Sequence, residues 1–207
     1  MVARLAELPG VLAVVWSPAG SWIEPELFRR AIADWLQGGD GGPATPLLVL
    51  FHGLEGSSRS HYAEAFADVA RERGWRYVVP HFRGCSGELN HAPRAYHSGD
   101  YEEVDWILAR VREHHAGPVL AVGISLGGNA LMRWAAEAGE GAAGRVAAVA
   151  SVCSPLDLAA GGRAIGRGFN RLVYTTMFLR SMKPKALAKL AQHPGLFARE
   201  RLMAARD

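Results

Sequence analysis

Residues 119–128 read Val-Leu-Ala-Val-Gly-Ile-Ser-Leu-Gly-Gly, an apolar strand that enters a tight turn and passes directly into a helical pattern. A turn this tight forces its central residue, Ser125, into strained backbone geometry. Glycines two positions before and after it leave room for the strand and the helix to approach each other. A serine hydroxyl is a weak nucleophile unless it is held in the open, beside a base and oxyanion donors. The pattern therefore predicts that Ser125 is a nucleophile carried on an elbow.

Strands and helices alternate on both sides of this turn. The apolar runs and helical periodicities predict strands at 47–51, 76–80, 118–124 and 146–152, and helices at 61–73, 101–115 and 126–137. Such βαβ units favour an α/β fold, a mostly parallel sheet with helices on both faces, in which ligands bind beyond the carboxyl ends of the strands. Before residue 46 the pattern is weaker. A strand at 11–16 and a helix at 25–36 are expected there, without an assigned function.

A glycine-rich loop, His-Gly-Leu-Glu-Gly-Ser-Ser at 52–58, directly follows the strand at 47–51. A loop in this place turns a backbone amide toward the acyl oxygen, and a second amide comes from the residue after the nucleophile. We therefore predict the N–H groups of Leu54 and Leu126 as the oxyanion hole. The alternative is a plain strand-to-helix turn. Five further residues of these motifs are expected to shape the site rather than react: His52, Gly53, Gly123, Gly127 and Gly128.

Composition limits the classes of protein that fit. The chain has 207 residues, 49% hydrophobic and 21% charged, which is typical of a soluble globular domain. Cys85 and Cys153 lie far apart without a metal-ligand pattern, so neither a disulfide framework nor a zinc site is expected. Glu7 and Pro9 interrupt a signal-like start, and no apolar run approaches the roughly 20 residues of a membrane span. We expect a cytoplasmic protein.

Phosphate recognition is not expected at either glycine-rich loop. A dinucleotide-binding fingerprint needs glycine where Ser125 stands, and a P-loop needs a Gly-Lys-Ser/Thr ending that both loops lack. We expect no nucleic-acid partner. Charge is nevertheless uneven, because residues 163–207 contain ten Lys or Arg and two acids, whereas the whole chain carries only +3. Two interpretations stay open for this basic segment: contact with anionic lipid or substrate, and ordinary solvated helix faces, which we favour.

Three motifs together resemble one protein family. They are the loop at 52–58, Arg-Gly-Cys-Ser-Gly-Glu at 83–88 with Tyr-His-Ser-Gly at 96–99, and the elbow with Asn129. Over about residues 46–190 the chain resembles the YheT-like branch of the α/β-hydrolases. The resemblance implies an α/β-hydrolase core at 46–157 and a helical cap at 158–207, after an N-terminal segment of uncertain role at 1–45. It also implies a serine carboxylesterase for short- or medium-chain acyl esters, with some members acting on glycerolipids, and no metal or organic cofactor.

The chain departs from the family after the elbow. In such hydrolases the acid and the histidine follow the serine, normally after two further strands, and these strands are missing here. Asp157 and His193 are weak candidates for the acid and the base. The histidines at 81, 91 and 97 lie in the loop at 81–99, the rim loop, and are expected to order this loop or bind substrate. We therefore expect an incomplete member whose activity as this chain is uncertain. Two alternatives stay open: a non-catalytic binding module, and an acyltransferase that uses the same serine. The oligomeric state is unknown.

Overall fold

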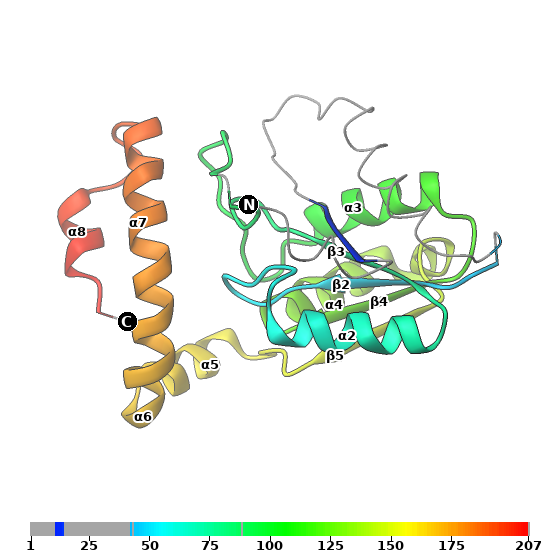
Figure 1. The fold of residues 1–207 in the computed structure, drawn as a ribbon. Helices are drawn as coiled ribbons and strands as arrows, with labels where there is room; N and C mark the ends of the chain where they lie inside the picture. The colour runs from blue at the N-terminus through cyan, green and yellow to red at the C-terminus, as the bar shows by residue number, and fades with distance from the viewer. Residues whose placement is uncertain (1–10, 15–41, 43, 88, 207) are drawn as a thin grey trace.

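The fold is built on a parallel sheet. The computed structural model describes residues 11–14, 42, 44–87 and 89–206 (Figure 1). Five strands pair in the order β1-β3-β2-β4-β5, and every pair is parallel. Their bounds are Val11–Val14 for β1, Leu47–Phe51 for β2, Arg76–Pro80 for β3, Val119–Ile124 for β4 and Ala148–Val152 for β5. The expected α/β architecture is thus confirmed.

Three helices cover the two faces of the sheet. Helix α2 (His61–Glu72) packs on one face, and α3 (Tyr101–His114) and α4 (Leu126–Ala138) pack on the other. Successive strand residues point to opposite faces. Accordingly Leu48 and Leu50 lie among the alanines of α2, whereas the odd-numbered residues of β2 lie against α3 and α4. Both faces of β2 are therefore buried, which explains its continuous apolar sequence.

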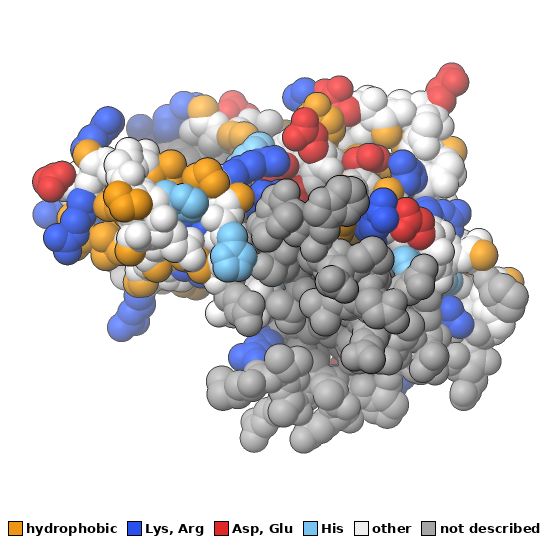
Figure 2. Space-filling model, turned by 90° about the horizontal axis from the view of Figure 1, so that it is seen from above, with side chains coloured by type: hydrophobic (Ala, Val, Ile, Leu, Met, Phe, Trp, Pro, Cys, Tyr) orange, Lys and Arg blue, Asp and Glu red, His pale blue; other side chains and the backbone are white. Residues whose placement is uncertain are grey.

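The remaining helices follow β4 and β5. They are η1 (Gly139–Gly144), α5 (Leu158–Ile165), α6 (Gly168–Asn170), the π-helical turn η2 (Arg171–Thr175), α7 (Thr176–Gln192) and α8 (Arg199–Ala204). In Figure 1, α5 to α8 lie beyond the carboxyl ends of the strands, and Figure 2 shows apolar and basic side chains mixed over the α7 and α8 region. None of the helices in the described ranges has the length and apolar character that crossing a membrane requires.

The predicted elements agree with the structure to within two residues at most ends. The strand predicted at 146–152 begins later, at Ala148, because the Val146 N–H bonds to the Ala142 carbonyl and completes the preceding turn. The strand predicted at 11–16 corresponds to β1, which pairs with β3 over Val11–Val14, and positions 15 and 16 lie outside the described residues. The helix predicted at 25–36 lies outside the described residues.

The strand order defines where a site can form. The chain passes from β2 to β3 on one side and then crosses to β4 on the other side of β2. Strand order therefore reverses between β2 and β4, and ligands in open α/β sheets bind outside such a reversal point. The loop at 52–58 follows β2 and Ser125 follows β4, so the two predicted parts of the site lie at this point.

Three glycines let α4 approach the sheet at the elbow. A Cβ on Gly127 would lie 2.4 Å from the carbonyl oxygens of Phe51 and His52, and one on Gly123 would lie 2.4 Å from the Cα of Gly128. These neighbours are backbone atoms, which cannot move aside as a side chain can. Only glycine therefore allows the start of α4 to lie directly against the ends of β2 and β4.

We expect Gly127→Ala to destabilise the fold by about 3 kcal/mol, the cost of overpacking against backbone. Gly162→Ala is the matched control, because a Cβ there meets nothing within 4 Å and the residue lies inside the exposed helix α5. That change should raise the free energy of unfolding by about 0.5 to 1 kcal/mol, the ordinary preference of a helix for alanine. Urea denaturation measures both, and equal effects of the two changes would contradict the packing argument.

Two buried histidines join the ends of β2 and β3. His52 Nδ1–H donates to the Gly53 carbonyl at 2.8 Å, and His52 Nε2 accepts the Phe82 N–H at 3.0 Å. His81 Nε2 accepts the Ser58 N–H at 3.0 Å, and the two imidazoles meet edge to face at 5.9 Å. Burial lowers the pKa of His52 to about 4 and that of His81 to about 3. Both side chains are therefore neutral structural groups at neutral pH.

These lowered pKa values predict that stability falls in mild acid. Above the ordinary pKa of 6.5 both histidines are neutral in the folded and unfolded states, so they add no pH dependence. As the pH falls from 6.5 toward 4, the unfolded chain binds protons that the folded chain does not. Each histidine then lowers the free energy of unfolding by about 1.4 kcal/mol per pH unit.

Urea denaturation at several pH values measures this slope. An NMR titration of the imidazoles gives a second measurement. If His52 and His81 were protonated in the folded protein near pH 6, the predicted loss of stability would not occur.

Candidate active site

Ser125 occupies the turn between β4 and α4. Its φ of 52° and ψ of −118° lie in a region that L residues rarely adopt, and strain of this kind is concentrated at functional sites. The turn is held from both sides, because the Ser125 N–H donates to the Val152 carbonyl at 2.9 Å and the Ser125 carbonyl accepts the Asn129 N–H at 3.0 Å. The side chain is half-buried. The backbone thus fixes the hydroxyl at the carboxyl end of β4.

The loop after β2 lies directly against the elbow. A Cβ on Gly53 would lie 3.3 Å from the Ser125 Cβ and 3.4 Å from the Ile124 carbonyl oxygen. Its φ is not in the left-handed region, so the close approach, rather than the backbone conformation, is what favours glycine here. Residue 53 therefore brings the loop amides beside the serine hydroxyl.

Most amides of this loop already have acceptors. The Gly53 N–H donates to the Tyr62 hydroxyl at 3.0 Å, the Glu55 N–H to the Tyr96 hydroxyl at 2.7 Å, and the Gly56 N–H to the Gly53 carbonyl at 2.9 Å. The Leu54 N–H has no acceptor among the described residues. The same holds for the Leu126 N–H, at the first position of α4, where helix geometry provides no acceptor. Gly127 and Gly128, the next two residues of α4, also lack an acceptor for their N–H groups among the described residues, so the free amides include, but are not limited to, the two predicted for the oxyanion hole.

Aromatic side chains form the wall behind this loop. Tyr96 stacks on Phe82 with ring centroids 5.5 Å apart, and the Tyr96 hydroxyl donates to Glu55 Oε1 at 3.0 Å. Cys85 lies beside Tyr96, and burial raises the pKa of its thiol to about 11. The thiol is therefore protonated at neutral pH and is a poor alternative nucleophile. The contacts of Tyr62 and Tyr96 with this loop were not predictable from the sequence, because a hydroxyl group that binds a loop through a tertiary contact leaves no local pattern.

Arg83 anchors the rim loop to α3. Its Nε donates to Glu103 Oε2 at 2.6 Å, and its N–H donates to Glu103 Oε1 at 3.2 Å. The Glu103 carboxyl is buried, and this burial raises its pKa against the opposing effect of Arg83. Arg83, the first residue of the Arg-Gly-Cys-Ser-Gly-Glu motif, therefore fastens the rim loop to α3.

The two weak triad candidates lie at helix ends. The Asp157 carboxylate accepts the Ala160 N–H at 2.8 Å and so caps the start of α5. His193 ends α7, and its Nε2–H donates to the His91 carbonyl at 2.7 Å. No hydrogen bond or ion pair in the described part of the chain joins either side chain to Ser125.

The rim histidines also have other partners. His81 binds Ser58, as described above, and His97 Nδ1–H donates to the Ser98 carbonyl at 2.7 Å while its Nε2 lies 3.9 Å from Asp100. His91 contributes its carbonyl oxygen to His193. Within the described ranges, no cluster of three His, Cys, Asp or Glu residues has an arrangement that could hold a metal ion.

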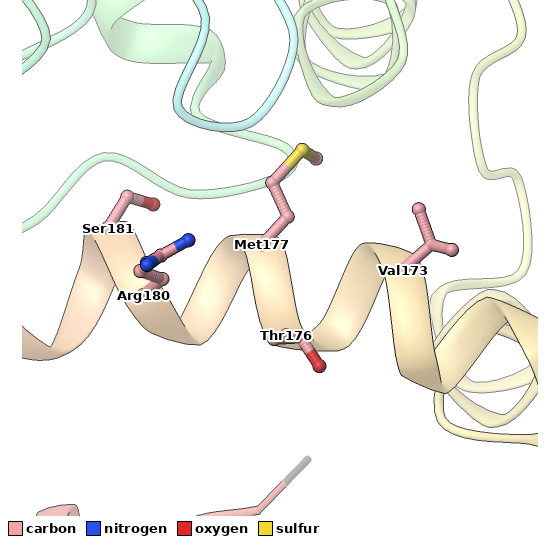
Figure 3. A pocket seen from close by; sticks show the side chains of 5 residues that line it. All are labelled: Val173, Thr176, Met177, Arg180 and Ser181. Carbon is pink, nitrogen blue, oxygen red and sulfur yellow. The ribbon is translucent and has the colours of Figure 1, made fainter.

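A groove of about 440 Å³ runs along one side of η2 and α7. In Figure 3, Met177 points from the helix toward the loops of the core, with Val173 and Ser181 one turn away on either side. Thr176 and Arg180 complete the lining. The volume is within the range of roughly 300 to 1,000 Å³ that small-molecule sites occupy. The groove wall is apolar at Val173 and Met177 and polar toward Arg180.

The comparisons with known proteins agree with these motifs. A family profile described as the alpha/beta hydrolase fold matches residues 46–181. YheT of Escherichia coli, which is named as an esterase, is 46% identical over 151 residues, 72% of this chain and 44% of that protein. The phospholipase ABHD3 of Bos taurus is 32% identical over 108 residues, 52% of this chain and 26% of that protein.

A third relative is named medium-chain fatty acid ethyl ester synthase/esterase 2, from Saccharomyces cerevisiae, and is 33% identical over 118 residues, 55% of this chain and 25% of that protein. No solved structure matches the chain. The chain spans less than half the length of these three relatives. The profile covers most of the described core, from β2 into α7. The chain therefore belongs to the α/β-hydrolase fold family, in which it is YheT-like.

Proposed function

We propose that this chain is a serine hydrolase that cleaves carboxylic esters through an acyl-serine intermediate on Ser125. The observation that carries the proposal is the pattern of amide partners around the serine. The loop amides at 53, 55 and 56 are engaged, and those of Leu54 and Leu126 are not. Backbone amides in folded proteins nearly always have partners, so the unpartnered Leu54 amide is unusual, whereas the Leu126 amide is open as the first amides of a helix normally are. Their occurrence in the loop and helix that flank a strained serine supports a ligand oxygen there.

The chemistry follows from this arrangement. The Ser125 oxygen attacks the acyl carbon, and the carbonyl oxygen takes up the negative charge between the Leu54 and Leu126 N–H groups. Collapse of this intermediate expels the alcohol, which takes up a proton, and water then releases the acid and restores the serine. Each amide donor contributes about 2.7 to 4 kcal/mol of barrier lowering in well-studied cases.

The rate depends on the base that takes the serine proton. Asp157 and His193 have no part in the proposal, because both serve helix ends. Oxyanion stabilisation and binding alone give a residual acceleration on the order of 10³ to 10⁴ over water. We therefore expect reactivity at Ser125 to be detectable but slow in this chain.

The groove along α7 suggests where the acyl group lies. In this proposal residues 158–207 act as a cap on the core at 46–157, and the apolar wall at Val173 and Met177 holds a short- or medium-chain acyl group. The names of the relatives support ester substrates: one is an esterase, one a phospholipase and one an ethyl ester synthase/esterase.

A serine-directed fluorophosphonate tests the proposal. We expect covalent labelling of the purified chain at Ser125, shown by peptide mass analysis and abolished by Ser125→Ala. Ser98→Ala, in the half-buried part of the rim loop, is the matched control and should label like the unaltered chain. If Ser125→Ala labels as fast as the unaltered chain, or the unaltered chain does not label at all, the chain is better described as a non-catalytic module.

Acyl transfer to an alcohol is the second candidate function. It is favoured by the similarity to a protein named as both an ethyl ester synthase and an esterase. The same serine and oxyanion hole serve both reactions, and only the acceptor of the acyl group differs.

The acceptor is identified from the products of p-nitrophenyl butanoate turnover in aqueous ethanol. For a hydrolase we expect butanoic acid as the main product. The share of ethyl butanoate among the products should be no larger than the mole fraction of ethanol in the solvent. Ser125→Ala corrects for spontaneous hydrolysis. A yield of ethyl ester well above that fraction would identify a transferase instead.

A further inference from the structure

Helix α7 contacts the loops that surround Ser125. Val173, Met177, Ser181, Lys185 and Lys189 follow one another at four-residue spacing through η2 and α7, so each lies about one helical turn from the next. The first three line the groove, and the two lysines reach the core. The groove wall and the contacts to the core loops therefore lie on successive turns of the same helix.

Lys185 contacts the loop at 52–58, the oxyanion loop of the proposed function. Lys185 Nζ lies 2.7 Å from Glu55 Oε2, and Glu55 directly follows Leu54. The Glu55 side chain is only 11% exposed, whereas the Lys185 side chain is 39% exposed. The pair therefore joins the cap helix to the residue next to the free amide, in a setting partly shielded from water.

Glu55 is held by its backbone and by its side chain. Its φ of 56° is rare for a residue other than glycine, so its conformation has to be imposed by contacts. The Tyr96 hydroxyl accepts the Glu55 N–H at 2.7 Å and donates to Oε1 at 3.0 Å, while Lys185 binds Oε2. Glu55 thereby fixes the peptide next to the Leu54 amide.

Lys189 shows that the fastening of α7 does not depend on Lys185. The Lys189 ammonium is buried and donates to the carbonyl oxygens of Asn90 and Ala92 and to Gln192 Oε1. It joins α7 to the rim loop without touching the oxyanion loop. Lys185 is more exposed and has one acidic partner, and ion pairs of that exposure add little to overall stability. Its effect is therefore local.

We infer that Glu55 and Lys185 are positioning residues. Their ion pair holds the Leu54 amide in the orientation that receives the oxyanion, and it makes that orientation depend on the position of α7. The inference rests on the proposed function, because it assigns the Leu54 amide to the reaction. Neither side chain touches the reacting atoms. The pair acts through the loop, and the groove helix and the oxyanion hole are linked by it.

The experiment compares rates of fluorophosphonate labelling at Ser125. Glu55→Gln keeps an acceptor for Tyr96 and removes the charge, and Lys185→Met removes the ammonium. We expect each change to slow labelling about tenfold, since misplacement of a catalytic group by about 1 Å can cost a hundredfold. The double variant should be no slower than either single variant, and Lys185→Arg should recover most of the rate.

Lys183→Met is the matched control on the same helix, because Lys183 donates to the carbonyl oxygens of Met203 and Ala205 and not to the rim. It should label at the unaltered rate. Salt separates an electrostatic role from a packing role, since about 1 M NaCl screens a partly exposed pair. High salt should lower the labelling rate of the unaltered chain to nearly that of the variants, and it should leave the labelling rate of Glu55→Gln unchanged. Labelling of Glu55→Gln and Lys185→Met at the unaltered rate would overturn the inference.

Hydrogen exchange distinguishes this outcome from failure of the proposed function. If Ser125 does not label even in the unaltered chain, the proposed function fails. The coupling is then decided by exchange of the Glu55 and Gly56 amides, both of which have acceptors within the core. Lys185→Met should speed their exchange severalfold and Lys183→Met should not. Equal exchange in all three proteins would show that α7 does not order the loop.

Discussion

The site depends on the close contact between the start of α4 and the ends of β2 and β4. The carbonyl oxygens of Phe51 and His52 lie within 2.4 Å of the position that a Cβ on Gly127 would take, so the helix and the strand meet backbone to backbone. This contact requires a turn too tight for ordinary geometry, and Ser125 carries the resulting strain at φ 52°. It also brings Gly53 against Ser125. The position of the serine and that of the loop beside it therefore have one cause, the absence of side chains at the elbow.

The hydrogen bonds of the loop after β2 determine which of its amides stays without an acceptor. The loop after β2 is held by hydroxyl groups from two separate elements, Tyr62 of α2 and Tyr96 of the rim, and His52 binds the Gly53 carbonyl from within the strand end. Each contact engages one polar group of the loop and leaves the Leu54 N–H without an acceptor among the described residues. A loop that is rigid because its other groups are bonded presents the remaining donor in a fixed direction, which is what electrostatic preorganisation requires.

The sequence predicted the parts of the fold and site that have local causes. Apolar runs and periodicities located β2 to β5 and α2 to α4, and the glycine spacing located the strained turn at Ser125. The roles of Ser125 as nucleophile and of the Leu54 and Leu126 amides as oxyanion donors stay predictions. The contacts that hold the loop were not predictable in this way, because Tyr96 and Lys185 are far from Glu55 along the chain and an ion pair leaves no periodic signal. Asp157 illustrates the opposite difficulty, since a carboxylate before a helix is as typical of a cap as of a catalytic acid.

The way α7 is attached bears on how the site works. Lys189 is its only buried residue, and large apolar side chains near its start remain exposed, with Phe169 at 77% and Leu172 at 73%. The helix is thus held to the described core chiefly through lysine contacts to carbonyl oxygens and to Glu55, rather than through a shared apolar core. Segments with few buried apolar contacts open at low free-energy cost. Under the proposed function, such a helix shifts when an acyl chain binds, and the Lys185–Glu55 pair carries the same shift to the residue beside the Leu54 amide.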